Sequence, residues 1–598
     1  MLFRSFTNSL ALVNVAAAAL SSSKPFLVGT RGALLITNSS VSPADAFDIS
    51  NGIVVLDSGS LTCPVNCDLQ SGALTVNGGT VSVGALTTGI RMGRRNGANA
   101  VMTLNGGTVT SPRCILGNVA GSTATLTIAG GNLICTSPAD PFNVGQIQTT
   151  TCNVNISSGS LIATNGFAGI ADRATATFNQ SGGNVMFGDL TMGGLGVGTY
   201  NLSGGSFTMM PFNSSNLFII ANMENADFNQ SGGTAVVHQE IHIADFTGVV
   251  GNLNVTGGQF IATNDLIAIG RYGIGSMLVS NAVAVLTNIS VGRHPGADGT
   301  LTVENGGTVS VIADLSIGRL VGSIGHMFVN GGLVSLTNDD LWVGRGGDGD
   351  LTINGGTLQA KILHVGNSDD GINAPNGILT VNGGATILPT GFFVGSVGIS
   401  TGAVTIVGGT VTSTNAAGTN KVDIASGSLT MNGGAITTDV ILMTNTAATF
   451  TFNNGLLRTR SMTVSNGASF VVGDGVNPAT LELQAGVHTF ANGLVIAPNA
   501  TVTGCGTIIG AVTNNGTYIN PCSAPPPATI SSVSRSGSTA SVSFLSTSGV
   551  NYTLEYKNAL TDLTWTPILP AQPGTGGVMT LSDSTATNRT RYYRVGAQ

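Results

Sequence analysis

A short strand-like segment that ends in a Gly-Gly pair recurs along most of the sequence. Typical copies read LTVNGG, FNQSGG, LTINGG and LTMNGG. The period is about 25 residues, because fourteen intervals separate Gly78 from Gly433, and Ser158-Gly159 and Asn281-Ala282 fill the two gaps. The first glycines of the pairs are Gly78, Gly106, Gly130, Gly182, Gly204, Gly232, Gly257, Gly306, Gly331, Gly355, Gly383, Gly408 and Gly433. A fixed period of this length is the signature of a repeat architecture.

Each period contains two further strand-like segments. A β-branched run such as Thr308–Val311 follows the glycine pair, and an L-x-[IV]-G segment such as Leu341–Gly344 comes next. Alternation along each segment sends Val, Leu and Ile inward and Thr, Ser and Asn outward. Gly and Asn suit the corners because both adopt positive φ at little cost. One period therefore predicts three short strands joined by tight corners.

Strands this short bury a core only if successive periods stack on one another. The sequence thus predicts an all-β fold, a parallel β-solenoid of about 25 residues per coil. At about 4.8 Å per coil, some eighteen to twenty coils would form a rod on the order of 90 Å long. A β-propeller is excluded because its blades need about 40–45 residues. The low content of charged residues, 8%, fits the solenoid, since like charges on adjacent coils would repel.

Composition excludes several other classes. With 21 Lys and Arg against 28 Asp and Glu the net charge is −7, so the basic stripe of a nucleic-acid-binding protein is missing. A hydrophobic content of 42% excludes a disordered chain. No stretch of eighteen uncharged apolar residues occurs, so we expect no integral membrane span.

The chain divides into four segments. Residues 1–25, with Arg4 before an apolar run, read as a secretory signal peptide or as a short alanine-rich helix that caps the first coil. Residues 26–522 form the predicted solenoid, and the proline-rich residues 523–527 form a stiff linker. Residues 528–598 predict a small β-sandwich, with strands at 539–544, 551–556, 578–581 and 591–595. A signal peptide would place the protein outside the cell or on its surface.

The seven cysteines lack the spacing of a zinc site. Cys505 and Cys522 flank the last glycine-rich stretch, and we expect them to form a disulfide if the protein is exported. Cys114, Cys135 and Cys152 are predicted to be small buried apolar side chains.

The LTVNGGTV units and the closing GTIIGAVTNNGT resemble the passenger-type strand repeats of bacterial autotransporters and related solenoids of secreted bacterial surface proteins. The resemblance covers roughly residues 70–520. The tail, with Tyr552–Leu560, Trp565 and Arg591–Arg594, looks like an immunoglobulin- or fibronectin-III-like module. The resemblance implies a secreted or cell-surface structural, adhesion-like rod that contacts extracellular polysaccharide or another cell-surface protein.

Charged residues recur around the third strand of several periods. Carboxylates precede it at Asp189, Glu240, Asp265, Asp314 and Asp340, and arginines follow it at Arg94, Arg271, Arg293, Arg319 and Arg345. These residues form either a groove for an acidic sugar or calcium ion, or exposed corner pairs worth at most about 1 kcal/mol each. The second interpretation is favoured, because a catalytic site is a single irregular cluster rather than a recurring position.

No catalytic residue and no cofactor are therefore predicted. The alternative function is a polysaccharide-degrading lyase or hydrolase of the parallel β-helix type, which would need acidic and basic side chains from neighbouring coils to converge in one deep groove.

His238, Glu240 and His242 form the sharpest local oddity. Strand alternation places them on one face, and two imidazoles with a carboxylate are zinc ligands. A flat strand splays such ligands, however, and no fourth ligand lies nearby in the sequence. They are weak metal candidates, and a solvated polar face is the favoured interpretation.

If a face of the rod binds carbohydrate, the site is predicted to lie around Trp342, His364, Asp340 and Arg345, although packing of Trp342 is the favoured interpretation. Alternation points the Trp342 ring outward, where an indole can stack on a sugar, and His364 should lie one coil away. Asp340 and Arg345 could bind sugar hydroxyl groups. On this hypothesis Trp342→Ala abolishes glycan retention and leaves stability nearly unchanged; the alternative is that Trp342 packs beneath a corner loop.

Overall fold

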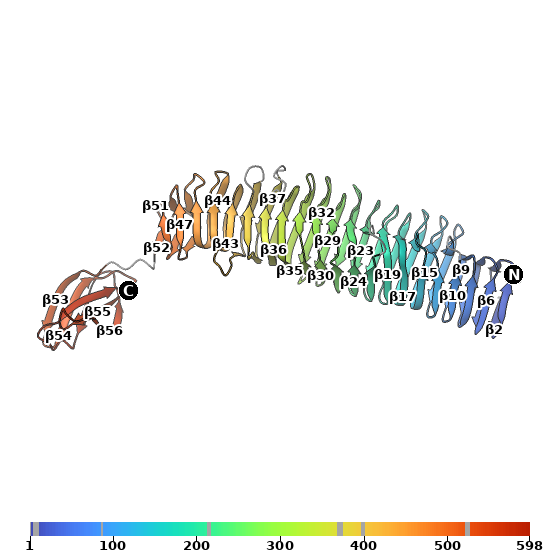
Figure 1. The fold of residues 1–598 in the computed structure, drawn as a ribbon, viewed down its shortest axis with the longest axis horizontal. Helices are drawn as coiled ribbons and strands as arrows, with labels where there is room; N and C mark the ends of the chain where they lie inside the picture. The colour runs from blue at the N-terminus through green and yellow to red at the C-terminus, as the bar shows by residue number, and fades with distance from the viewer. Residues whose placement is uncertain are drawn as a thin grey trace.

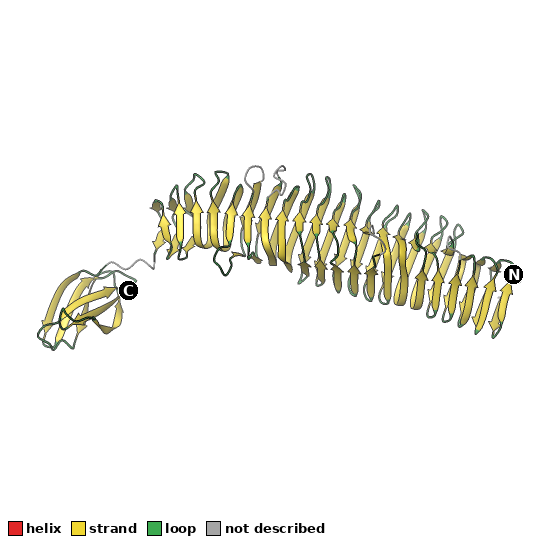
Figure 2. Cartoon of the chain, viewed as in Figure 1, coloured by secondary structure: helices red, strands yellow, loops and turns green. Residues whose placement is uncertain are grey.

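The protein is built from β-strands. The structure, a computed structural model, describes residues 2–3, 11–84, 88–211, 217–366, 375–395, 401–520 and 527–597. It has 64% strand and, among the described residues, no helix (Figure 2). None of these residues belongs to a helix with the length and hydrophobicity needed to cross a bilayer.

Strands β1–β52 form one parallel β-solenoid of about 20 turns, with about 24 residues in each turn. Successive coils lie side by side along the rod (Figure 1). Pairing is in register, so that β26 (Val250–Val255) pairs with β29 (Ile274–Ser280), and β29 with β32 (Asp298–Glu304). The predicted fold class and repeat are confirmed.

Three strands per coil build three faces in the region that matters below. The second strands are β24 (Thr234–Val237), β27 (Gln259–Ala262), β30 (Val283–Leu286), β33 (Thr308–Val311), β38 (Ala385–Ile387) and β41 (Thr410–Ser413). The third strands are β25 (Glu240–Ile243), β28 (Ile267–Ile269), β31 (Ile289–Val291), β34 (Leu315–Ile317), β39 (Gly391–Val394) and β42 (Lys421–Ile424). Strands β35 (Ile324–Val343) and β36 (Asp348–Val365) run through all three positions of their coils.

The two glycines of the pair Gly232-Gly233 are needed for different reasons. A Cβ on Gly232 would lie 2.4 Å from the carbonyl oxygen of Ser203 in the preceding coil. Gly233 has φ +69°, a conformation that L side chains rarely adopt. Close stacking of coils therefore explains the first glycine of this pair, and positive φ acts only at the second; at Gly306 and Gly331 the first glycine has the positive φ instead.

Gly232→Ala is expected to lower the free energy of unfolding by about 1–3 kcal/mol, because the added methyl overpacks the coil contact. Gly355→Ala is the matched control: this first glycine has no atom within 3.9 Å of its Cβ position and no positive φ. Its effect should stay within about 0.5 kcal/mol. Urea denaturation of both variants measures the difference, and equal effects would contradict the explanation.

The interior is one continuous apolar core. It contains a stack of aromatic rings, in which Phe178 and Tyr200 have centroids 4.5 Å apart and Tyr200 and Phe228 4.9 Å apart. The buried Tyr200 hydroxyl donates to Gln180 Oε1 at 2.5 Å. Outside, asparagine amides form a polar ladder along the axis, at Asn155, Asn179, Asn201, Asn229 and Asn254.

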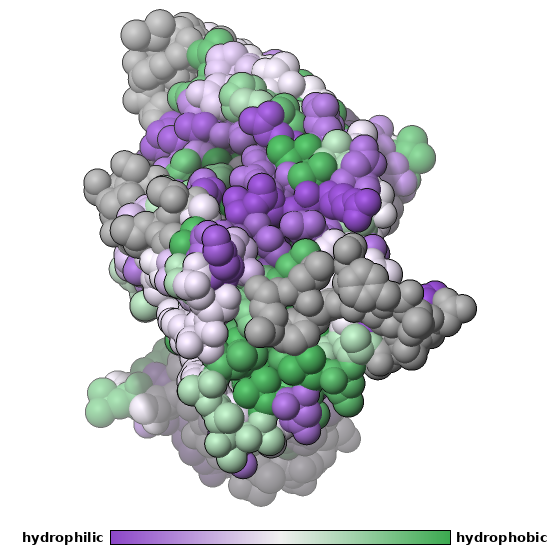
Figure 3. Space-filling model, turned by 90° about the vertical axis from the view of Figure 1, so that its right-hand side faces the viewer, coloured by the Kyte–Doolittle hydropathy of each residue, from purple (hydrophilic) through white to green (hydrophobic). Residues whose placement is uncertain are grey.

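The first coil begins earlier than predicted. Residues 11–22 form β2 (Ala11–Ala16) and β3 (Ala19–Ser22), which pair in parallel with β5 (Gly32–Thr37) and β6 (Ser39–Pro43). The alanine-rich helix is therefore wrong for these residues, because pairing with the next coil overrides helix propensity. A signal peptide in residues 1–25 stays a prediction. Figure 3 looks onto this end of the rod and shows hydrophobic residues gathered below a more hydrophilic region.

The C-terminal residues form two antiparallel three-stranded sheets. One contains β53 (Ile530–Ser536), β54 (Thr539–Leu545) and β57 (Val578–Asp583), and the other β55 (Asn551–Lys557), β56 (Thr566–Pro573) and β58 (Tyr592–Ala597). Both contribute to a core of their own, around Phe544 and Tyr552. The four predicted strands are confirmed, and β53 and β56 were missed. The likeness to an immunoglobulin or fibronectin-III module stays a prediction, and the linker, except Pro527, lies outside the described residues.

The cysteines of the solenoid body are buried and free, as predicted for Cys114, Cys135 and Cys152. Burial raises the pKa of the Cys114 thiol to about 12, so the thiol is not reactive at neutral pH. Cys505 is disulfide-bonded, but Cys522 lies outside the described residues, and the Cys505–Cys522 pairing stays a prediction.

Candidate functional site

Side chains that can carry chemistry gather on the outward side of the third strands between residues 240 and 423. We call this surface the third-strand strip. Its central column, paired residue by residue from coil to coil, is His242, Ala268, Ser290, Ser316, Trp342, His364, Phe393 and Asp423. All four arginines of this stretch follow a third strand, at Arg271, Arg293, Arg319 and Arg345. The strip therefore combines charge and aromatic rings on one rigid face.

The four residues predicted to bind carbohydrate lie together on this strip. The rings of Trp342 and His364 stack with centroids 3.9 Å apart and an interplanar angle of 8°. Phe393 continues the stack, 5.2 Å from His364. Asp340 Oδ2 lies 3.2 Å from His364 Nε2, and the Arg345 guanidinium carbon lies 4.8 Å from the Trp342 ring centroid.

Both faces of the Trp342 ring are covered. Arg345 donates to Asp314 and Ser316 in the preceding coil at 2.5 and 3.2 Å, whereas His364 belongs to the following coil. The two groups therefore sandwich the indole from opposite sides. A sugar that stacks on an open indole face would need one of them to move, so the edge of the half-buried ring is the part offered to a ligand.

The histidines near β25 have different surroundings. His238 and Gln239 lie between β24 and β25, and His238 and Glu240 are both half-buried, with the buried Gln239 between them. His238 Nδ1 contacts Asn264 at 3.2 Å, while His242 is buried beside Glu240. A solvated polar face is therefore wrong for His242. Among the described residues, no group of three or more His, Cys, Asp or Glu is placed to hold a metal ion.

His242 instead lies between two carboxylates. Its Nε2 is 2.9 Å from Glu240 Oε1 and its Nδ1 is 2.9 Å from Asp245 Oδ1. Both carboxylates are thus close enough to favour the protonated imidazole. Burial lowers the pKa of His242, but Asp245 and Glu240 outweigh it, and the pKa is raised above the usual 6.5. Arg271 binds the same Asp245 at 2.8 Å.

We expect His242 to stabilise the fold more at lower pH. Because the pKa is raised on folding, its contribution is fully present below about pH 6.5 and is lost as the pH rises through the folded-state pKa. The stability gap between wild type and His242→Gln should therefore widen from about pH 8.5 to about pH 5.5. His294→Gln is the control of opposite sign, since burial and Arg293 lower the pKa of His294. Urea denaturation across this range measures both gaps; parallel profiles would refute the assignment.

The carboxylates that precede the third strands do not all occupy equivalent positions in their coils. The register aligns Asp314 with Asp340 and Glu240 with Leu266, so Asp265 is one residue out of the row and accepts a hydrogen bond from the Leu266 N–H. Asp314 and Asp340 are both engaged, by Arg345 and His364 respectively. These contacts favour the interpretation as corner pairs over the interpretation as a convergent catalytic groove.

Asp189 is the exception among these carboxylates, because no charged group of the described residues balances it. Burial raises the pKa of its carboxyl to about 6, although the backbone N–H groups of Leu217 and Leu190 act in the opposite direction. A carboxyl whose pKa rises on folding destabilises the folded state as the pH increases through that range.

Asp189→Asn is therefore expected to stabilise the protein at about pH 7.5 and to have little effect near pH 4. The amide oxygen keeps the acceptor role and removes the buried charge. Thermal unfolding at the two pH values gives the comparison, with Asp227→Asn on the outward side of β23 (Ala226–Gln230) as control. Equal effects of Asp189→Asn at both values would rule out the raised pKa.

A pocket of about 290 Å³ lies on the strip between β31 and β34. Its lining includes the hydroxyl groups of Ser290 and Ser316 together with the charged side chains of Arg293, Arg319 and Asp314. Sequence reasoning missed it, although the small residues of the column, Ala268, Ser290 and Ser316, leave a gap between His242 and Trp342.

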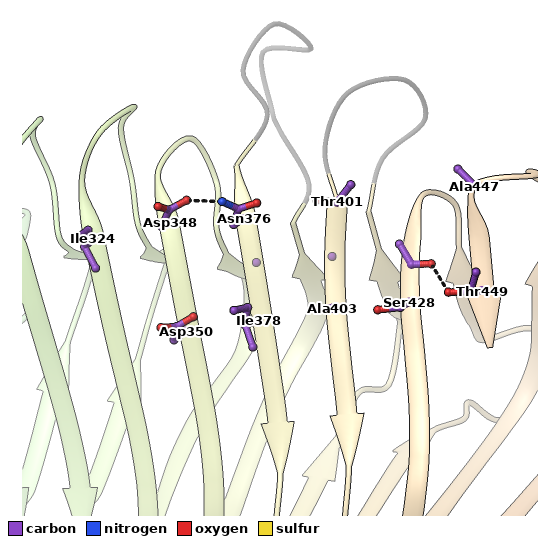
Figure 4. A pocket seen from close by; sticks show the side chains of 13 residues that line it. Ile324, Asp348, Asp350, Asn376, Ile378, Thr401, Ala403, Ser428, Ala447 and Thr449 are labelled. Atoms are coloured by element: carbon purple, nitrogen blue, oxygen red, sulfur yellow. Dashed lines mark hydrogen bonds between the residues drawn. The ribbon is translucent and has the colours of Figure 1, made fainter. Parts of the chain in front are cut away.

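A wider groove of about 640 Å³ lies on the face of the first strands (Figure 4). Its labelled side chains include the carboxylates Asp348 and Asp350 and the apolar Ile324 and Ile378, and Asn376 Nδ2 donates to Asp348 Oδ1 at 3.0 Å. Asp350 lies 3.2 Å from His326 Nδ1. The described lining contains no lysine or arginine, so this groove differs in charge from the pocket of the strip.

Comparison with known proteins gives no relative. No protein-family model matches the chain, and neither the curated proteins nor the solved structures contain a match. Arguments about function therefore rest on the geometry of this chain.

Proposed function

We propose that the protein is a secreted or cell-surface rod of the structural, adhesion-like type, and that the third-strand strip contacts extracellular carbohydrate. The observation that carries the proposal is the arrangement of this strip, where aromatic and charged side chains recur once per coil over eight coils. At about 4.8 Å per coil the strip extends for roughly 35 Å along the rod. A ligand that is itself a long repeating polymer matches such a surface. A protein on another cell surface is the other partner considered.

Rigidity supports the proposal. The stack of Arg345, Trp342, His364 and Phe393 fixes planar groups that would otherwise lose rotamer freedom on binding. Ring edges and the polar atoms around them can then contact a sugar at little entropic cost. Weak contacts repeated along the strip add up through multivalency.

The alternative is a polysaccharide-degrading β-helix enzyme. Glycoside hydrolysis needs two carboxyl groups across one bond, one of them a proton donor. Asp314 and Asp340 lie on consecutive coils, but each is held by a cationic or imidazole partner, and Asp189 lies six coils away from Asp340. The geometry therefore favours the binding function.

Retention of the intact protein on immobilised polysaccharides, with the release of reducing ends measured in parallel, tests the proposal. Retention without depolymerisation is the expected result. Depolymerisation would favour the enzyme, and no retention on any acidic or neutral polysaccharide would overturn carbohydrate contact.

Trp342→Ala is expected to weaken polysaccharide retention and also to lower stability, by roughly 0.5–1.5 kcal/mol, because it removes stacking on both ring faces. This differs from the sequence-based expectation of unchanged stability. Trp565→Ala, which alters the second tryptophan in the C-terminal sheets, is the matched control and should leave retention unchanged. Retention assays measure binding by both variants, and urea denaturation measures their stability. Full retention by Trp342→Ala would exclude the ring from the binding surface.

A further inference from the structure

The pocket between β31 and β34 contains a hydroxyl group without a partner. Ser290 is 2% exposed, and its Oγ forms no hydrogen bond among the described residues. The equivalent Ser316 in the next coil donates to Asp314 at 3.0 Å and accepts from Arg345. Buried polar groups are almost always paired, so an orphaned hydroxyl that lines a pocket indicates a ligand atom that completes it.

Arg293 on the wall of the same pocket is also uncompensated. Arg271 and Arg345 each bind a carboxylate, at 2.8 and 2.5 Å. The guanidinium of Arg293, in contrast, forms no hydrogen bond or ion pair within the described part of the chain. Burial lowers the pKa of Arg293; Glu240 offsets this in part, and Arg271 and Arg319 add repulsion. A negative charge beside Arg293 would offset both the cost of burying its charge and its repulsion by the neighbouring arginines.

The geometry points to an oxyanion-binding subsite in this pocket, where the Arg293 guanidinium and the Ser290 hydroxyl bind the carboxylate or sulfate group of an acidic saccharide. Arg319 contributes a second positive charge to the pocket wall. A guanidinium matches either group because its planar N–H donors bind two oxygens at once. The saccharide part of the inference rests on the proposed function.

Asp314 also lines the pocket and would repel an anion if it were unpaired. Its Oδ2 accepts hydrogen bonds from Arg345 Nη1 at 2.5 Å and from Ser316 Oγ at 3.0 Å. The charge is thus balanced by Arg345, and Arg293 adds a positive charge to the pocket. Asp314 then acts as the acceptor that holds Arg345 against Trp342.

The size of the pocket limits what enters it. A volume of about 290 Å³ is at the lower end of ligand pockets, so one charged group with its sugar ring fits rather than an oligosaccharide. The next coil along the column is that of Trp342. A chain bound at the subsite can therefore continue along the strip toward the aromatic stack.

The test measures binding of the intact protein to immobilised polygalacturonate, dextran sulfate and neutral dextran at low ionic strength. We expect retention on an acidic polymer and not on dextran. Arg293→Gln should weaken this retention at least about tenfold, and Ser290→Ala about threefold to tenfold. Arg458→Gln, which removes an arginine paired with Glu482 on another coil, is the matched control and should bind as wild type.

The outcomes show whether the bound group is a carboxylate or a sulfate. Retention on polygalacturonate alone assigns a carboxylate, and retention on dextran sulfate alone assigns a sulfate. Undiminished binding by both Arg293→Gln and Ser290→Ala, or equal retention on dextran, would overturn the subsite. Circular dichroism checks that Arg293→Gln is folded. If it is not, binding by Ser290→Ala tests the subsite, because this substitution removes one hydroxyl group and changes no charge.

A thermal-shift assay with sodium galacturonate and sodium sulfate separates the subsite from the proposed function. Stabilisation of wild type but not of Arg293→Gln, combined with no retention on any polymer, would support the oxyanion subsite and reject polysaccharide contact. Retention on polymers that depends on Trp342 but not on Arg293 would support polysaccharide contact and reject the oxyanion subsite.

Discussion

Backbone hydrogen bonding between coils, in register and parallel, is the constraint on which the rest of the structure depends. Each residue lies about 4.8 Å from its equivalents in the coils before and after it. Apolar residues therefore stack on apolar residues, and asparagines form ladders such as Asn201–Asn229–Asn254. The same constraint excludes a Cβ at Gly232, where the backbone of the preceding coil approaches most closely. Repetition in the sequence is the direct result of repetition in these contacts.

The architecture could be predicted from the sequence because this constraint acts on every period alike. Gly-Gly corners and strand alternation alone gave the three strands and the parallel stacking. Prediction failed where a contact between neighbouring elements decides the outcome. His242 was expected on a solvated polar face, but it is buried between Glu240 and Asp245. Residues 11–22 form strands despite their alanines, since the contact that decides their conformation is with the next coil.

The sequence predicted which residues lie at the candidate site but not which contacts they make. Alternation placed Trp342 and His364 on one face in consecutive coils, and the structure brings Asp340 and Arg345 to them. Periodicity could not show that Arg345 reaches back one coil to Asp314 and covers the indole. It also could not show which arginines find partners, because partner choice depends on side-chain reach across coils. That difference separates Arg271 and Arg345, which are paired, from Arg293.

A column of arginines is an unfavourable arrangement in a solenoid, since stacking places like charges within about 5 Å of one another. Elsewhere the outward positions of this protein use neutral Asn, Thr and Ser ladders that avoid such repulsion. In the strip, Asp245 balances Arg271 and Asp314 balances Arg345, so most of the repulsion is removed by carboxylates of the same face. Among the described residues Arg293 has no such partner, and the hydroxyl of Ser290, which lines the same pocket, has none either. Two groups of complementary function that lack partners and line one pocket are better explained by a ligand than by the requirements of folding.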